Sequence, residues 1–503
     1  MSSSPDAAPA AVPLTPDRLD DLHPAVDVPA YDRDALVPAV VHIGVGGFHR
    51  AHQAVYFDDL ARSGRSTEWG VVGVGLHSPR MRDALAGQDN LYAVVERGPE
   101  TDQVHVVGVL TDYHYAPDDP GAVLDRLADP RTRLVTLTIT GTSYPQGEPD
   151  RDDPDVVADV ETPSTPGTAF GFLVEALARR RAAGVGPFTV LSCDNVQHNG
   201  DVARAAVLAT ARLRDAGLAE WIAEHVAFPS SMVDRITPET TPGEREAIAR
   251  EHGLDDTWPV ITEPFSQWIV EDCFCAGRPP LEEVGVQFVD NVTPYEVMKT
   301  RLLNGSHCAL AYLGHLAGFR TTDEAMADPR MRGFVEGYLE EVAALLLAVP
   351  GIDLAAYRAT LVERFSNARL SDGLDRLARR GSTKVPSYVL PSLQQALDQD
   401  RPRGHVVLAT AAWLRYLRGT DYAGAPIEIA DAEADRLSQL ARAGGTDPHP
   451  FLEGSGLFGT LGDSARLAAE LTAALQALEE GPLEAAERLR APDVLTQAEG
   501  TAA

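Results

Sequence analysis

The chain has 503 residues, which is too long for one hydrophobic core, so we expect two or three domains. Its formal net charge of −31 at pH 7 argues against a nucleic-acid backbone or an anionic membrane surface as a partner. Its apolar and charged content is that of an ordinary globular protein.

Residues 1–36 are rich in Ala, Pro and Asp and predict an N-terminal arm rather than a signal peptide. No apolar run approaches the ~18–20 residues that span a bilayer. The four cysteines are too few for a disulfide framework and indicate a cytoplasmic protein. The pair Cys273 and Cys275 lacks a second ligand pair, so no zinc site is predicted there.

Residues 37–290 alternate short apolar strands with helical stretches. Strands are expected at 37–46, 70–76, 91–96, 104–111, 134–140 and 188–192, with helices at 50–60, 80–86, 120–128, 170–183 and 202–216. Alternation of this kind predicts a doubly wound, Rossmann-type α/β domain. The stretch 146–168, dense in Asp, Pro and Thr, is expected to be a surface excursion from this domain.

Beyond residue 290 the helical period dominates and strand signals nearly vanish. The clearest helices are predicted at 334–347, 357–365, 370–378, 406–418 and 463–478. We therefore predict an arm over 1–36, a dinucleotide-binding domain over 37–290 and a mostly α-helical domain over 291–503.

A glycine-rich turn follows the first strand and opens a helix, which is the context of a dinucleotide fingerprint. It consists of Gly44, Val45, Gly46, Gly47, Phe48, His49 and Arg50. Glycines permit the tight turn and a close approach of the backbone to a pyrophosphate. His49 occupies the sixth position, where glycine or alanine is usual, so the match is incomplete and a plain strand–helix turn is the alternative.

The second strand should end with an acid that holds the ribose of NAD. Here it ends Leu76-His77-Ser78-Pro79-Arg80, without an acid. His77 and Arg80 are still predicted to contact the cofactor. Arg80 and Arg82 could instead meet a 2′-phosphate, or simply start a solvated helix, so NAD is expected and NADP stays open.

A helix is predicted from Thr293, with Thr293 as N-cap, Pro294 at the first position and Glu296 completing a capping box. On an α-helix of about 100° per residue, with Lys299 at zero, Glu296 lies at about 60°, His307 at about 80° and Asn304 at about 140°. The polar side chains thus share one broad arc of an otherwise apolar helix.

This arc could carry out alcohol chemistry. A buried lysine can lower its pKa and take a hydroxyl proton, while Asn304 and His307 donate to the developing alkoxide. Lys299 is one of only two lysines in a chain rich in arginine, which never deprotonates. Codon bias would explain this rarity, and interdomain hydrogen bonds would explain the trio, without any chemistry. The pair Tyr295 and Lys299 also matches the spacing in short-chain dehydrogenases, whose base is the tyrosine.

Several motifs together resemble the polyol-specific long-chain dehydrogenases, the family of mannitol 2-dehydrogenase and fructuronate reductase. The resemblance spans nearly the whole chain. Its motifs are H-I-G-V-G-G-F-H-R-A-H-Q-A (42–54), S-C-D-N-V-Q-H-N-G (192–200), F-P-S-S-M-V-D-R-I-T-P (228–238), E-P-F-S-Q-W-I-V-E-D (263–272), V-T-P-Y-E-V-M-K-T-R-L-L-N-G-S-H (292–307) and E-R-F-S-N (363–367).

The resemblance implies a monomeric or loosely associated, metal-independent enzyme with its active site between a Rossmann-type and a helical domain. Lys299 would be the general base, Asn304 and His307 would polarise the reacting oxygen, and Glu296 would connect the lysine to solvent. The substrate hydroxyls would be held by Asn195, Asp234, Arg376 and Lys384. One departure is Gly141 in Thr140-Gly141-Thr142-Ser143-Tyr144, where family members commonly carry glutamate.

The sequence therefore predicts an NAD(P)-dependent dehydrogenase that interconverts a polyol and a ketose, with D-mannitol and D-fructose as the first choice. Fructuronate and mannitol 1-phosphate are the alternatives within this class, and both are anionic. A dinucleotide-binding sensor without turnover is the alternative from another class, suggested by the missing glutamate at Gly141.

Overall fold

The computed structural model describes residues 11–144 and 153–489, which form two compact units with a division between Thr293 and Pro294. The start of the predicted arm (1–10) and the start of the predicted surface excursion (146–152) lie outside the described residues. The units are described separately below.

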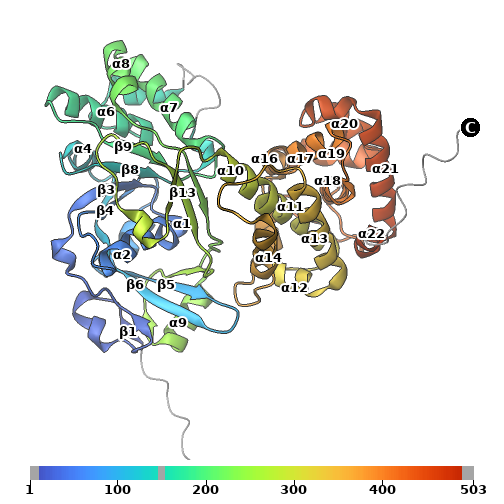
Figure 1. Cartoon of the computed structure of the whole chain (residues 1–503), viewed down its shortest axis with the longest axis horizontal. Coiled ribbons are helices and arrows are strands. Elements are labelled where there is room, and N and C mark those ends of the chain that lie inside the picture. Colours follow the sequence, from blue (N-terminus) through green and yellow to red (C-terminus); the bar gives the residue numbers. More distant parts are fainter. Residues whose placement is uncertain (1–10, 145–152, 490–503) are drawn as a thin grey trace, which may run out of the picture. The chain divides into compact units, whose positions relative to one another are not determined.

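A five-stranded parallel sheet organises unit 1 (Figure 1). Its order is β7-β4-β3-β8-β9, with bounds β3 Pro38–Ile43, β4 Gly70–Gly75, β7 Leu110–Tyr115, β8 Leu134–Leu137 and β9 Thr189–Ser192. Numbered along the chain, the order is third-second-first-fourth-fifth, which is that of a Rossmann half-sheet. The predicted Rossmann-type fold is confirmed.

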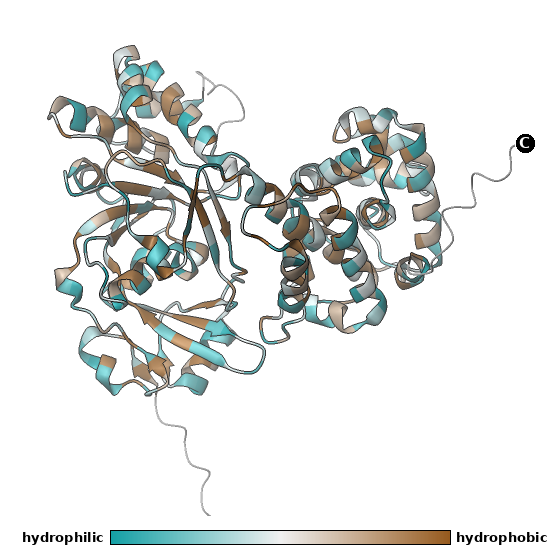
Figure 2. Cartoon of the chain, in the orientation of Figure 1, coloured by the Kyte–Doolittle hydropathy of each residue, from teal (hydrophilic) through white to brown (hydrophobic). Residues whose placement is uncertain are grey.

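Both faces of this sheet are covered, as its apolar strands require. Val41, Val72 and Val135 pack on one side against four helices: α4 Pro120–Ala128, α6 Ala169–Ala182, α7 Asn199–Arg214 and α8 Ala216–His225. Val40 and Val71 pack on the other side with α2 Gln53–Arg62. Figure 2 shows brown, hydrophobic residues along strands inside unit 1.

Not every predicted strand joins the parallel sheet. The strand expected at 104–111 is two strands, β6 Asp102–Val107 and β7. Strands β5 Tyr92–Arg97 and β6 pair antiparallel in a second sheet of order β12-β5-β6-β2, with β12 Val260–Thr262 and β2 Val26–Asp27. A third sheet has the order β10-β13-β14, with bounds Ser231–Asp234, Gln267–Glu271 and Gln287–Val289.

The remaining short elements complete unit 1. The pair β1 Val12–Pro13 and β11 Leu254–Asp255 is parallel, and Leu14 beside it is buried, so part of the predicted arm packs onto this unit. The helices are α1 Gly47–Ala51, α3 Arg80–Ala86, α5 Pro154–Glu161 and α9 Pro242–His252. Helix α5 lies within the segment expected to be an excursion.

Unit 2 is helical over its described residues. At its centre lies α11 Gly305–Leu316, which packs against α13 Pro329–Ala343, α15 Leu374–Ala378, α16 Gly381–Tyr388 and α18 Gly404–Tyr416. The other helices are α12 Thr322–Ala327, α14 Leu354–Phe365, α17 Leu390–Asp398, α19 Ala434–Gly444, α20 His449–Gly454, α21 Ala465–Glu480 and α22 Pro482–Arg488. The predicted helical C-terminal domain is confirmed.

The helix predicted from Thr293 is interrupted. Helix α10 spans Thr293–Lys299, a π turn follows over Thr300–Asn304, and α11 continues from Gly305. The angles expected for an ideal α-helix therefore do not hold beyond Lys299. The capping box between Thr293 and Glu296 stays a prediction.

Candidate active site

The glycine turn lies where the sheet order reverses, between β3 and β8. In open α/β sheets, ligands bind at the carboxyl ends of the strands at this point. Gly44 has φ +100°, and a Cβ there would lie 2.3 Å from the Thr138 carbonyl oxygen at the end of β8. Only glycine can occupy this position. A Cβ at Gly46 would meet only the Gly44 oxygen, at 3.8 Å, so its backbone is open to an approaching group.

Of the remaining residues of the predicted cofactor motif, some lie at the surface and others are buried in the core. Gly47 is exposed, but His49 and Arg50 are each only 1% exposed. The His49 ring stacks on His42 with centroids 3.4 Å apart, and Arg50 donates to the Trp258 carbonyl. The side chains of His49 and Arg50 therefore build the floor of the turn, and only their backbone could face a cofactor. The helix expected from Arg50 is two helices, α1 and α2, divided at His52.

The two predicted contacts after β4, His77 and Arg80, are exposed. The Arg80 guanidinium lies over the Trp258 ring, 4.8 Å from its centroid. Arg82 is engaged by two carboxylates, Asp83 at 2.7 Å and Asp118. Its charge is thus already compensated, which weakens the case for a 2′-phosphate at this position.

Asp194 joins the ends of β8 and β9, and sequence reasoning missed it. Its carboxylate accepts from the amides of Ile139 (3.1 Å) and Thr140 (2.8 Å) and from the Tyr144 hydroxyl (2.7 Å). Burial raises the pKa of Asp194, and these hydrogen bonds oppose that shift. Thr140 has φ +73°, which is rare for a β-branched residue, so these bonds hold a strained turn in place.

The predicted substrate residues of unit 1 lie on neighbouring segments. Asn195 follows β9 and is exposed, whereas Asp234 ends β10 and is 3% exposed. Asn199 connects the segments: its amide donates to the carbonyls of Asp194 (3.0 Å) and Ser231 (2.8 Å), and its oxygen accepts from the Ser231 amide (2.9 Å). Asp194 and Asn199 both stand in the motif 192–200, which was the available signal.

In unit 2 two of the predicted catalytic residues are buried, and the other two, Asn304 and His307, are half-buried. Glu296 and Lys299 are each 7% exposed. Two nitrogen atoms, Asn304 Nδ2 and His307 Nε2, are buried without a hydrogen-bond partner among the described residues. Buried polar atoms are usually hydrogen-bonded, so a bound ligand could provide the acceptor for these two nitrogens.

Positive charges surround His307. Burial lowers its pKa well below the usual value, and the charges of Arg376, Arg364, Lys384 and Lys299 act in the same direction. The structure thus brings together four predicted site residues of unit 2, Lys299, His307, Arg376 and Lys384. Arg364, in the motif 363–367, is a further member that had been assigned no role.

The predicted substrate ligands of unit 2 are held by their neighbours. Arg376 donates through Nε and Nη2 to Asp372, which is 2% exposed. The Lys384 ammonium donates to the Leu377 carbonyl at 2.9 Å, and burial lowers the pKa of this lysine. Tyr295 donates its hydroxyl to the Pro350 carbonyl at 2.8 Å, which argues against its use as the base of a short-chain dehydrogenase.

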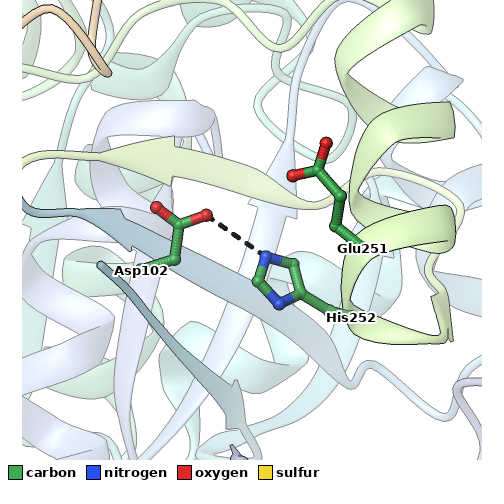
Figure 3. A group of neighbouring side chains, drawn as sticks. All are labelled: Asp102, Glu251 and His252. Atoms are coloured by element: carbon green, nitrogen blue, oxygen red, sulfur yellow. Dashed lines mark hydrogen bonds and ion pairs between the residues drawn. The ribbon is translucent and has the colours of Figure 1, made fainter. Parts of the chain in front are cut away.

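Asp102, Glu251 and His252 lie close enough to share a metal ion (Figure 3). His252 Nε2 lies 3.2 Å from an Asp102 oxygen, while Glu251 is exposed and lies 3.8 Å from Arg250. Contacts within the protein thus already involve all three side chains. Metal independence stays a prediction.

A Rossmann sheet with an open glycine turn, together with a helical unit carrying a buried lysine and a half-buried histidine, defines a two-domain nucleotide-linked dehydrogenase. The mannitol dehydrogenase Rossmann domain matches residues 38–283, and the mannitol dehydrogenase C-terminal domain matches residues 291–479. The chain belongs to the mannitol dehydrogenase family.

Relatives cover nearly the whole chain. A mannitol 2-dehydrogenase from Phaeosphaeria nodorum is 44% identical over 94% of this chain and 84% of its own length. A mannitol 2-dehydrogenase from Aspergillus terreus is 45% identical over 90% of this chain and 93% of its own length. Among solved structures, the Pseudomonas fluorescens mannitol 2-dehydrogenase complex with NAD and D-mannitol has a TM-score of 0.87 at 42% identity, covering 96% of this chain and 100% of its own. A substrate-free D-sorbitol dehydrogenase has a TM-score of 0.86 at 38% identity, and the match covers 94% of this chain and 99% of its own.

Across the described ranges, none of the helices is both long and apolar enough to cross a membrane.

Proposed function

We propose that this protein is an NAD-dependent polyol dehydrogenase that interconverts D-mannitol and D-fructose, with Lys299 as general base. The observation that carries the proposal is the pair of buried, unpartnered nitrogen atoms, Asn304 Nδ2 and His307 Nε2, on the helical segment that follows Lys299. A substrate oxygen would supply the missing acceptor. The relative of known structure that binds NAD and D-mannitol is 42% identical, which supports this choice of ligands.

In the oxidative direction, Lys299 takes the proton of the reacting hydroxyl. Asn304 and His307 donate to the same oxygen as negative charge develops on it. His307 stays neutral because burial and the surrounding cations lower its pKa, so its ring donates one hydrogen bond without giving up a proton. NAD, when bound, accepts the hydride from the carbinol carbon.

The glycine turn fits a dinucleotide. The backbone of Gly46 and Gly47 is open, and Gly44 provides the tight return from β3. The open amides would hold the pyrophosphate. NAD is favoured over NADP because two carboxylates compensate Arg82, which leaves one less arginine for a 2′-phosphate.

A neutral polyol is favoured over fructuronate or mannitol 1-phosphate. Arg376, the predicted ligand of the substrate hydroxyls, already forms a two-bond pair with Asp372. An anionic substrate would compete with that buried carboxylate for the same guanidinium. Asn195, Asp234 and Lys384 complete the proposed set of substrate ligands, and Glu296 would connect Lys299 to solvent.

We further propose that the enzyme works as a monomer in the cytoplasm. All four cysteines are free thiols, which suits a reducing compartment. Light scattering on the purified protein tests the oligomeric state.

The test is a screen of D-mannitol, D-sorbitol, arabinitol, fructuronate and fructose 6-phosphate with NAD(H) and NADP(H). We expect D-mannitol oxidation with NAD to have the highest kcat/KM. Lys299→Ala should lower kcat by several orders of magnitude while circular dichroism and NAD binding stay unchanged. Near-normal turnover in that variant would refute the role of Lys299. Absence of turnover with every pair, together with tight NAD binding, would favour a sensor.

A further inference from the structure

The π turn Thr300–Asn304 separates the lysine from the other two catalytic residues. The Gly305 amide donates to the carbonyls of Thr300, five residues earlier, and Leu302, three residues earlier, and not to that of Arg301, four residues earlier. Within the described ranges this is the one π segment. Segments of this kind make up less than about 1% of residues in globular proteins, and they are frequent at functional sites.

The turn changes which side chains share a face. It takes up one residue more than an α turn, so later side chains lie about 100° behind their α-helical positions. His307 moves from about 80° on one side of Lys299 to about 20° on the other, and Asn304 from about 140° to about 40°. His307 and Asn304 therefore lie closer to the helix face that carries Lys299. This agrees with the effect of the Lys299 charge on the pKa of His307.

Ser306 stabilises the turn from within. Its side chain is fully buried, and its hydroxyl donates to the Leu302 carbonyl and, at 3.0 Å, to the Leu303 carbonyl. Both carbonyls belong to the π turn, where the regular ladder of amide partners is shifted. The Leu302 carbonyl also accepts from the Gly305 amide, so the Ser306 hydroxyl adds a second donor there and provides a donor to Leu303, where the amide ladder is shifted.

Gly305 allows the turn to fit its surroundings. A Cβ at this position would lie 2.4 Å from the Tyr338 hydroxyl on α13 and 3.1 Å from the Tyr388 carbonyl on α16. Since the φ of Gly305 is −66°, glycine is needed here for space and not for backbone freedom. Helices far away in sequence thus limit what this end of the turn can carry.

We propose that the π turn is a positioning device, held by Ser306 and Gly305, that brings Asn304 and His307 to the face of Lys299. The inference rests on the proposed function, in which these three side chains act on one oxygen. Ser306 and Gly305 are positioning residues and touch neither substrate nor cofactor. Misplacing a reacting group by ~1 Å can cost about 100-fold in rate, so a change of the turn should appear in kcat.

The first test is Ser306→Ala, with Thr410→Val as the matched control. Thr410 is also fully buried in unit 2, and its hydroxyl donates to the Val406 carbonyl four residues earlier in an ordinary helix. We expect Ser306→Ala to lose at least tenfold in kcat with an unchanged KM for NAD. Thr410→Val should keep kcat, with a comparable change in melting temperature. Equal kcat in the two variants would overturn the proposal.

The second test uses a compensating pair. Gly305→Ala places a methyl group against the Tyr338 hydroxyl and should lower kcat at least tenfold. Tyr338→Phe removes that oxygen, so the double variant should recover most of the loss. A double variant as slow as Gly305→Ala contradicts the proposal. If both Ser306→Ala and Gly305→Ala fail to fold while Thr410→Val folds, the turn has a structural role only, and the proposal is wrong.

A structural readout separates this inference from the proposed function. If the wild type oxidises no polyol, or Lys299→Ala stays active, the proposed function fails. A crystal structure of Ser306→Ala still decides about the turn. Regular α-helical bonding over 300–304 with a displaced His307 ring supports positioning by Ser306. An unchanged π turn overturns it.

Discussion

Asp372, just before α15, holds Arg376 on that helix through two hydrogen bonds, with 2.7 Å between Arg376 Nε and Asp372 Oδ1. Asp372 is 2% exposed, while the arginine side chain is 40% exposed. The buried carboxylate thus fixes the orientation of the guanidinium, which is the group that solvent or a substrate can reach. A pair that uses Nε and Nη2 leaves the Nη1 edge pointing away from Asp372.

The pair predicts a selective effect on substrate binding. Asp372→Asn keeps the shape but removes the charge that orients Arg376, so the KM for polyol should rise about tenfold while the KM for NAD stays constant. Steady-state kinetics with each ligand varied checks this. An anionic substrate would show the opposite: a lower KM for fructuronate in Asp372→Asn would mean that the guanidinium is a carboxylate site.

His307 should act as a neutral donor. Burial and four nearby cations lower its pKa well below 6.5, which favours the neutral ring near pH 7. His307→Ala should lower kcat about 100-fold, as expected for one lost donor to a developing oxyanion. The pH–rate profiles of variant and wild type should have the same shape. A limb near pH 6.5 that disappears in the variant would show that His307 titrates during turnover.

The sequence predicted the fold class because the apolar strands and the helical period are local signals. It could not assign β5 and β6 to a separate sheet, since alternation marks a strand but does not name its partner. The strands of the third sheet are only three to five residues long, and two of them, β10 and β13, lie in segments interpreted as motifs. Short strands carry too few residues for a period to be visible.

The candidate site was found only in part for a related reason. Lys299, Asn304 and His307 stand out by residue type on an apolar helix. The π turn between them depends on Gly305 lying against α13 and α16, which no local pattern encodes. Asp194, Asn199 and Asp372 act on other protein groups, so their roles became visible only with their partners in place.

A neutral histidine whose ring nitrogen is buried should make unit 1 less stable in acid. Burial lowers the pKa of His105 to about 3, whereas in the unfolded chain it binds a proton below about 6.5. Between these values the unfolded state holds more protons, so the free energy of unfolding falls as the pH is lowered and is fully restored above about 6.5. His105→Gln should reduce that slope by about 1.4 kcal/mol per pH unit.

Urea unfolding of wild type and variant between pH 6.5 and 5 measures this difference. His449→Gln is the control, because that ring is exposed on unit 2 and paired only with exposed Asp447. It should leave the slope unchanged. If the free energy of unfolding changed with pH equally in wild type and His105→Gln, His105 would have to be protonated in the folded protein.

Two glycines of the turn after β3 should separate folding from cofactor binding. At Gly44, with φ +100°, a methyl group would lie 2.3 Å from the Thr138 oxygen, so Gly44→Ala should lower the melting temperature strongly. Gly46 has ordinary extended backbone (φ −129°), and its methyl group would meet only the Gly44 oxygen at 3.8 Å. Gly46→Ala should therefore fold normally but place a methyl group where the pyrophosphate approaches, and weaken NAD binding about tenfold or ~1.4 kcal/mol. Calorimetric titration with NAD, beside thermal melts of both variants, checks the pair. If Gly46→Ala bound NAD with wild-type affinity, the glycine turn would not be part of the cofactor site.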